Sequence, residues 1–111
     1  MSRATAAPDV RVVLVTAPGA EAETLGRALV GERLAACVNF VPGVRSIYRW
    51  EGEVQADEET LLVIKTTEAR LAALVERVHA LHSYDLPEVL ALPAAGGSGA
   101  YLAWVAEESR P

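Results

Sequence analysis

The stretch that decides the fold reads ACVNFVPGVRSIYRWEGE and covers residues 36–53. β-Branched and aromatic residues recur in it, which is typical of extended strands. Pro42-Gly43 interrupts the pattern, and such a pair inside a strand favours a bulge or bend over a break. Glu51-Gly52-Glu53 predicts a tight turn, because glycine takes positive φ without steric cost. With residues 54–67, the stretch predicts one long β-hairpin.

The remaining elements follow on either side of this hairpin. Short apolar runs bounded by proline and glycine predict strands, and apolar residues at three- and four-residue spacing predict helices. The predicted elements are a strand at 10–16, a helix from about Pro18 to Gly31, the hairpin, a helix from Glu68 to about Ser83, a strand at 88–93 and a short helix around 101–105.

The element order predicts an α+β fold. Strand, helix, hairpin, helix and strand are the split βαβ arrangement of ferredoxin-like folds, here with an extra C-terminal helix. We expect one antiparallel four-stranded sheet with both long helices on one face. Residues 10–111 form a single predicted domain, and residues 1–9 are expected to be a short disordered tail rather than a signal peptide.

Composition restricts the classes of partner. The chain has 111 residues, a formal net charge of −5 and 51% hydrophobic residues, so a real core is affordable and the charge disfavours nucleic acid. We expect no membrane partner, since no apolar run approaches the length of a span. Cys37 is the single cysteine, so neither an intramolecular disulfide nor a Cys-x-x-Cys motif can form. A cytoplasmic location is expected.

The hairpin length predicts an oligomer. Each arm of about fifteen residues extends roughly 50 Å, whereas a compact domain of this size is about 35 Å across. The hairpin should therefore overhang its own domain, with Ile47, Tyr48 and Trp50 near its tip. Such an overhang is unstable alone in water, so we expect it to pack on a neighbouring copy. The alternative is that Pro42-Gly43 folds the hairpin back over its own sheet.

Four segments together carry a family resemblance. Residues 36–53, 59–66, 82–89 and 101–105 resemble, in order, the signature segments of the CutA (divalent-cation tolerance) family. One departure is His82-Ser83-Tyr84-Asp85, where the family commonly has His-Pro-Tyr-Glu. The resemblance implies a ferredoxin-like fold assembled as a homotrimer similar to the PII signalling proteins. It also implies binding of copper or another divalent cation.

Cys37 and His82 are the predicted metal ligands. Thiolate suits Cu(I), and imidazole suits Cu(II) and zinc, so copper is the expected ion. Both residues match positions in the family motifs. The alternatives are that Cys37 is a small buried apolar residue and that backbone carbonyls satisfy His82 at the helix end. His79, three residues earlier, is expected on the surface.

A second group of residues predicts a cleft between subunits. Lys65, Glu59 and Glu88 lie in apolar strand surroundings, where a buried charge needs a partner. We expect them to meet at an inter-subunit cleft with Tyr84 and Trp50 as walls. The alternatives are a structural salt bridge for the charges and interface packing for the aromatic residues.

Three functional hypotheses remain. The sequence has no nucleophile elbow, P-loop, dinucleotide fingerprint or His-Glu-x-x-His motif, so a non-enzymatic role without an organic cofactor is expected. The first hypothesis is a divalent-cation tolerance protein that binds copper as a trimer. The second is a PII-like regulatory trimer that senses a small ligand and signals to a protein partner. The third is a structural scaffold.

Overall fold

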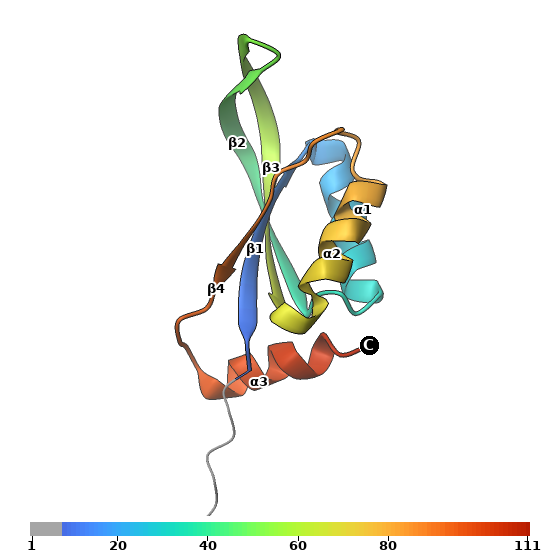
Figure 1. Ribbon diagram of the computed structural model, residues 1–111, viewed down its shortest axis with the longest axis vertical. Coiled ribbons are helices and arrows are strands. Elements are labelled where there is room, and N and C mark those ends of the chain that lie inside the picture. The colour runs from blue at the N-terminus through green and yellow to red at the C-terminus, as the bar shows by residue number, and fades with distance from the viewer. Residues whose placement is uncertain (1–7) are drawn as a thin grey trace, which may run out of the picture.

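The computed structural model describes residues 8–111, so most of the predicted tail over residues 1–9 lies outside the described residues. Figure 1 shows a four-stranded sheet with three helices. The elements are β1 (Val10–Ala17), α1 (Gly19–Gly31), β2 (Cys37–Trp50), β3 (Glu53–Thr67), α2 (Glu68–Leu81), β4 (Val89–Pro93) and α3 (Gly99–Glu108).

The sheet has the predicted ferredoxin-like topology. Its strand order is β2-β3-β1-β4, and every neighbouring pair is antiparallel. α1 and α2 lie together on one side of the sheet (Figure 1). The α+β prediction is therefore confirmed, including the extra C-terminal helix.

Strand alternation builds the core between sheet and helices. Val13 and Val15 of β1 and Leu62 and Ile64 of β3 point toward the helices and are fully buried. Leu29, Leu74 and Val78 meet them from α1 and α2. Burying each of these side chains contributes roughly 1.5–3 kcal/mol. This core joins α1 and α2 to one face of the sheet, and most of the other face has no helix against it.

The hairpin contains the predicted bulge and turn. Val41 pairs with Leu61 and Val44 with Glu59, so Pro42 and Gly43 together oppose a single residue of β3. Gly43 has φ of 73°. At the tip, Glu51 and Gly52 have φ of 52° and 81°, as a two-residue hairpin turn with both central residues left-handed requires.

The hairpin also overhangs the domain. The molecule measures 60 × 25 × 22 Å, and its longest direction follows the paired arms of β2 and β3 (Figure 1). The arms run on past the helical layer, so the alternative in which the hairpin folds back over its own sheet is wrong. Ile47 and Val54 near the tip are 74% and 68% exposed, which leaves apolar surface without cover.

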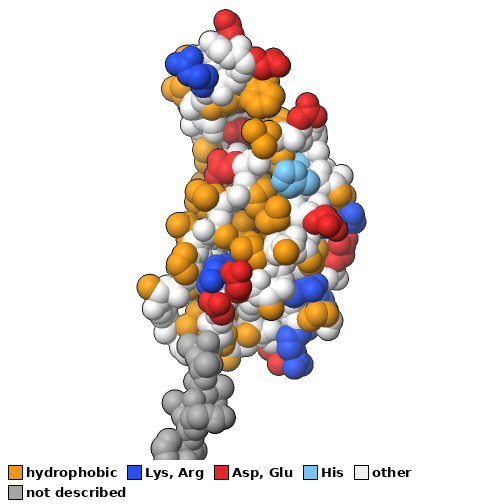
Figure 2. Space-filling model, viewed as in Figure 1, with side chains coloured by type: hydrophobic (Ala, Val, Ile, Leu, Met, Phe, Trp, Pro, Cys, Tyr) orange, Lys and Arg blue, Asp and Glu red, His pale blue; other side chains and the backbone are white. Residues whose placement is uncertain are grey.

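The sheet face opposite α1 and α2 is apolar too, and we call it the open face. Because Val13 and Val15 point to the helices, their neighbours along β1 point the other way. Leu90 and Leu92 of β4 lie on this face and are 55% and 45% exposed. The open face is formed mainly by Val12, Leu14, Leu61, Val63, Leu90 and Leu92. Figure 2 shows hydrophobic side chains gathered in the middle of the molecule and again near the hairpin end.

α3 covers one end of the sheet. Val105 is fully buried against Val10 and Ala36. The Arg33 guanidinium donates to the carbonyls of Arg110 and Glu107 at 2.5 and 2.9 Å, which places a cation at the negative end of the helix. None of the helices within residues 8–111 is long and apolar enough to cross a membrane.

A buried hydrogen bond provides a stability test of this packing. The Thr66 hydroxyl, fully buried, donates to the Leu34 carbonyl at 2.7 Å. We expect Thr66→Val to lower the free energy of unfolding by about 1–3 kcal/mol, because the carbonyl loses its buried donor. Urea titration at fixed protein concentration measures this change.

The matched control is the adjacent threonine. Thr67 is the N-cap of α2, and its side chain makes no capping hydrogen bond. Thr67→Val is therefore expected to change stability by less than about 0.5 kcal/mol. Equal losses in the two variants would contradict the importance given to the Thr66 hydrogen bond.

Candidate functional site

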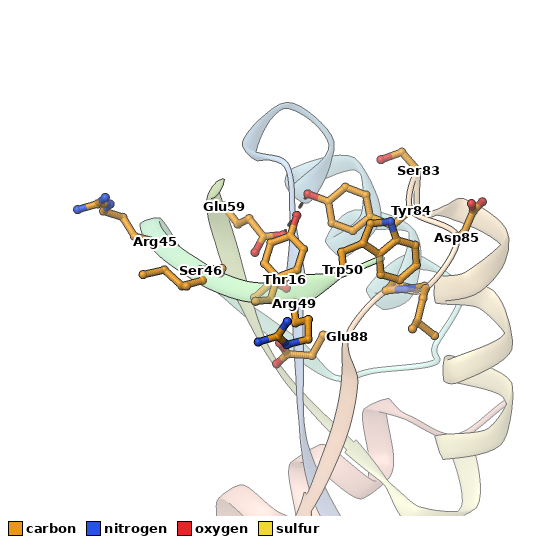
Figure 3. A pocket seen from close by; sticks show the side chains of 14 residues that line it. Thr16, Arg45, Ser46, Arg49, Trp50, Glu59, Ser83, Tyr84, Asp85 and Glu88 are labelled. Atoms are coloured by element: carbon orange, nitrogen blue, oxygen red, sulfur yellow. Dashed lines mark hydrogen bonds between the residues drawn. The ribbon is translucent and has the colours of Figure 1, made fainter. Parts of the chain in front are cut away.

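A cleft of about 860 Å³ lies between the outer half of the hairpin and the loop from α2 to β4 (Figure 3). β2 supplies one wall and residues 83–88 supply the other. The lining residues are Thr16, Arg45, Ser46, Ile47, Tyr48, Arg49, Trp50, Glu59, Ser83, Tyr84, Asp85, Leu86, Pro87 and Glu88. Aromatic rings and carboxylates therefore share one concave surface.

Glu59 and Tyr84 join the two walls. The Tyr84 hydroxyl donates to Glu59 Oε2 at 3.1 Å (Figure 3). Glu59 is only 6% exposed. Burial, reinforced by the hydrogen bond to Glu59, raises the pKa of Tyr84 to about 12. The phenol therefore stays protonated at neutral pH and continues to donate to the carboxylate.

A second phenol–carboxylate pair lies further along the hairpin. The Tyr48 hydroxyl donates to Asp57, and this hydrogen bond raises the pKa of Tyr48. Ser46 pairs with Asp57 and Tyr48 with Gln55, so the bond runs diagonally between the two strands. Tyr48 is thereby held against the hairpin beside the cleft.

His82 fixes the loop that carries Tyr84. Its Nδ1 accepts a hydrogen bond from the Tyr84 backbone N–H at 3.0 Å. Nε2 must then carry the proton, and it donates to the Thr16 carbonyl at 2.8 Å. The imidazole ring of His82 and the phenol ring of Tyr84 lie 4.7 Å apart, measured between their centroids. Glu21 Oε1 accepts from the Ser83 N–H at 3.1 Å. The loop is thus tied to β1 and α1.

The structure does not bring Cys37 and His82 together within one chain. Cys37 pairs with Lys65, whereas Thr16, which holds His82, pairs with Leu61. Four residues along a strand separate these positions by roughly 13 Å. Val38 packs against the helix-side core, so Cys37 lies on the open face. The expected approach of the helix end to Cys37 is therefore wrong, because α2 ends over β1.

Each candidate ligand has other neighbours. The side chain of His82 is fully buried, and both of its ring nitrogens are hydrogen-bonded, which is the backbone-satisfied alternative for this residue. Cys37 is partly buried, 3.9 Å from Asn39 Oδ1. Within residues 8–111, no group of three or more His, Cys, Asp or Glu side chains is arranged to hold a metal ion.

Four of the five residues predicted for a cleft between subunits line this cleft within one chain. Glu59, Glu88, Tyr84 and Trp50 are all part of its wall. Lys65 is the exception, because it lies six residues along β3 from Glu59, roughly 20 Å away. Its ammonium donates to Asn39 Oδ1 instead. Within one chain Lys65 therefore does not reach Glu59 or Glu88, and their predicted meeting between subunits stays a prediction.

Several lining residues were not predicted from the sequence. Arg45, Ser46, Arg49 and Asp85 belong to the cleft, and Asp57 holds Tyr48 beside it. The sequence did contain a signal for the contact between Tyr48 and Asp57. The two-residue turn at Glu51-Gly52 sets Trp50 opposite Glu53, and counting outward places Tyr48 diagonal to Asp57.

Comparison with known proteins gives a consistent family. The family model described as CutA1 divalent ion tolerance protein matches residues 11–108. A Thermus thermophilus protein named divalent-cation tolerance protein CutA is 57% identical over 99 residues, covering 88% of this chain and 96% of that protein. Arabidopsis thaliana has a protein named CutA, chloroplastic, that is 54% identical over 89% of this chain. This chain spans only 55% of the length of that plant protein.

Solved structures agree with the sequence comparison. A divalent cation tolerance protein from Thermus thermophilus has a TM-score of 0.87 at 55% identity, with 89% of this chain and 97% of that chain covered. A PII-like protein CutA from Nostoc has a TM-score of 0.85 at 33% identity, with coverages of 90% and 97%. Since the family model spans nearly the whole described chain and relatives share more than half of its aligned residues, this chain belongs to the CutA1 divalent ion tolerance protein family.

Proposed function

We propose that the chain acts in divalent-cation tolerance as a non-enzymatic homotrimer that works in the cytoplasm and binds copper or a similar ion. The observation that carries the proposal is the uncovered apolar surface: the open face of the sheet and the overhanging end of the hairpin. Leu90 is 55% exposed and Ile47 is 74% exposed, and apolar surface on this scale marks an interaction site.

A closed ring of copies accounts for both surfaces. Each hairpin can pack on the next copy, and the open faces can meet around a common axis. The solved Nostoc relative is called a PII-like protein, which supports the trimer implied by the sequence resemblance. Ile47 and Val54 near the hairpin tip are 74% and 68% exposed, as expected for apolar residues that a neighbouring copy covers.

The metal proposal rests on Cys37 and on ligands from a neighbouring copy. Cys37 lies on the open face, where we expect another subunit to pack, so a shared site can supply ligands that one chain lacks. The thiolate favours copper over harder ions. His82 was predicted as the second ligand, but it would have to break a hydrogen bond to Thr16 or Tyr84 before either nitrogen could bind metal.

A second candidate function is a PII-like regulatory role. The cleft supports it, because it is a concave site with aromatic walls and a buried carboxylate. A structural scaffold would need neither metal nor ligand. Titrating metal-free protein with Cu(I), Cu(II) and Zn(II) beside a panel of small organic ligands separates the three roles.

The open face provides the assembly test. We expect wild-type protein to scatter light with three times the chain mass. Leu90→Lys should shift this mass toward that of one chain, because an unpaired charge buried in an interface is strongly unfavourable. Multi-angle light scattering over a range of micromolar concentrations measures the change.

A lysine at a similarly exposed apolar position controls for this test. Leu81 is 40% exposed but lies at the end of α2, away from the open face. Leu81→Lys should leave the oligomer unchanged. A wild-type mass of one chain, or equal dissociation in both variants, would reject the proposed interface.

Copper affinity tests the metal proposal. We expect Cys37→Ser to weaken Cu(I) binding by roughly tenfold or more, because a hydroxyl is a far poorer ligand than a thiolate. Binding should also weaken as the pH falls, since the thiol must lose its proton to coordinate. Anaerobic calorimetry on metal-free protein gives both results.

His82 supplies the comparison for this titration. If the ring only fixes the loop, His82→Gln should lower stability and leave copper affinity within about twofold of wild type. Wild-type affinity in Cys37→Ser would remove Cys37 from the site. A large loss in His82→Gln with an intact trimer would return the histidine to it.

A further inference from the structure

We propose that the cleft binds a small organic cation, an ammonium or guanidinium group, with Glu59 as its counter-charge and Trp50 and Tyr84 as aromatic walls. This inference goes beyond metal tolerance and does not depend on Cys37. It starts from a carboxylate that the chain buries without giving it a positive partner.

Glu59 is the central observation. Only 6% of the surface of this residue is exposed. Among residues 8–111, no lysine, arginine or histidine nitrogen lies within 4 Å of its carboxylate, and the Tyr84 hydroxyl is the one hydrogen-bond donor to it. That bond uses Oε2, and Glu59 is one of the residues that line the cleft. A buried carboxylate strongly favours an added cation.

Tyr84 is a lasting hydrogen-bond donor to this carboxylate. The phenol donates to Glu59 and, with its raised pKa, remains a neutral donor across the physiological range. The cleft therefore presents a carboxylate beside an aromatic face.

The walls determine the kind of cation. Tyr84, which is hydrogen-bonded to Glu59, is 37% exposed, and Trp50, which lines the same cleft, is 41% exposed (Figure 3). Aromatic faces attract ammonium and guanidinium groups, most strongly where water is excluded. A bare divalent ion would instead need several close oxygen ligands, and residues 8–111 offer no such group. A volume of about 860 Å³ also suits an organic molecule.

The remaining charges are consistent with a cationic ligand. Glu88 and Asp85 add negative charge to the loop wall. Arg45 and Arg49 also line the cleft, but both are exposed, and Figure 3 shows Arg45 directed away from the other side chains. An anion in the cleft would meet the carboxylates of Glu59, Asp85 and Glu88, which disfavours it.

Tryptophan fluorescence tests the proposal directly. The chain has two tryptophans, so Trp104→Phe leaves Trp50 as the single reporter. This protein is titrated with tetramethylammonium, guanidinium and spermidine chlorides at constant ionic strength, with sodium chloride as the reference. We expect a saturable change with at least one organic cation. Glu59→Gln should weaken that binding roughly tenfold or more, as loss of a charged hydrogen-bonding partner does.

The neighbouring glutamate is the matched control. Glu58 is exposed and points to the opposite side of β3, so Glu58→Gln should bind like the parent. Light scattering and circular dichroism confirm that each variant keeps its assembly and fold. Equal binding in Glu59→Gln, or no saturable change with any organic cation, would overturn the proposal.

Two other occupants are distinguished in the same assay. Lys65 of a neighbouring copy could fill the cleft, in which case Lys65→Met protein would bind the organic cations and its parent would not. Zinc chloride or calcium chloride could compete at concentrations well below those of the organic cations. Either result would assign Glu59 to a different cation and overturn the proposal.

Discussion

The pairing of β2 with β3 is the interaction on which the rest of the structure depends. Its register decides which side chains join the core and which form the open face, because alternate residues point to opposite sides of a sheet. Val38 packs against the helix-side core, while Cys37 faces the other way. The same ladder extends past the helices and carries Tyr48 and Trp50 to the cleft. Core, open face and candidate site therefore share one set of hydrogen bonds.

Much of this arrangement could be predicted from local patterns. Turn residues at 51–52 and a proline–glycine pair at 42–43 specify the hairpin and its bulge, and each has a backbone requirement that few residues meet. Apolar spacing identifies α1 and α2 because their buried stripes are regular. The grouping of Glu59, Glu88, Tyr84 and Trp50 was also accessible, since buried charges and aromatic residues need neighbours.

Distances between elements were harder to predict. Alternation gives the face on which Cys37 lies, but nothing local specifies where α2 ends across the sheet. It ends over β1, so His82 meets the Thr16 carbonyl and not the thiol. The partner of Lys65 within one chain was not predicted for a similar reason. The apolar surroundings of Lys65 indicated that its charge needs a partner. Asn39, its diagonal neighbour on β2, is that partner. The chemistry of the side chains suggested metal ligands and ion pairs, whereas strand register determines which side chains meet within one chain.

The bulge at Pro42-Gly43 lets the direction of the outer hairpin arm change without a change in its strand register. Because these two residues oppose one residue of β3, the outer arm keeps its cross-strand partners whether one or two residues stand there. What the additional residue alters is direction, since a bulged strand bends and twists more. Insertion or deletion of one residue at this point can therefore change the direction in which the arm carries Tyr48 and Trp50. The side chains on the arm stay the same.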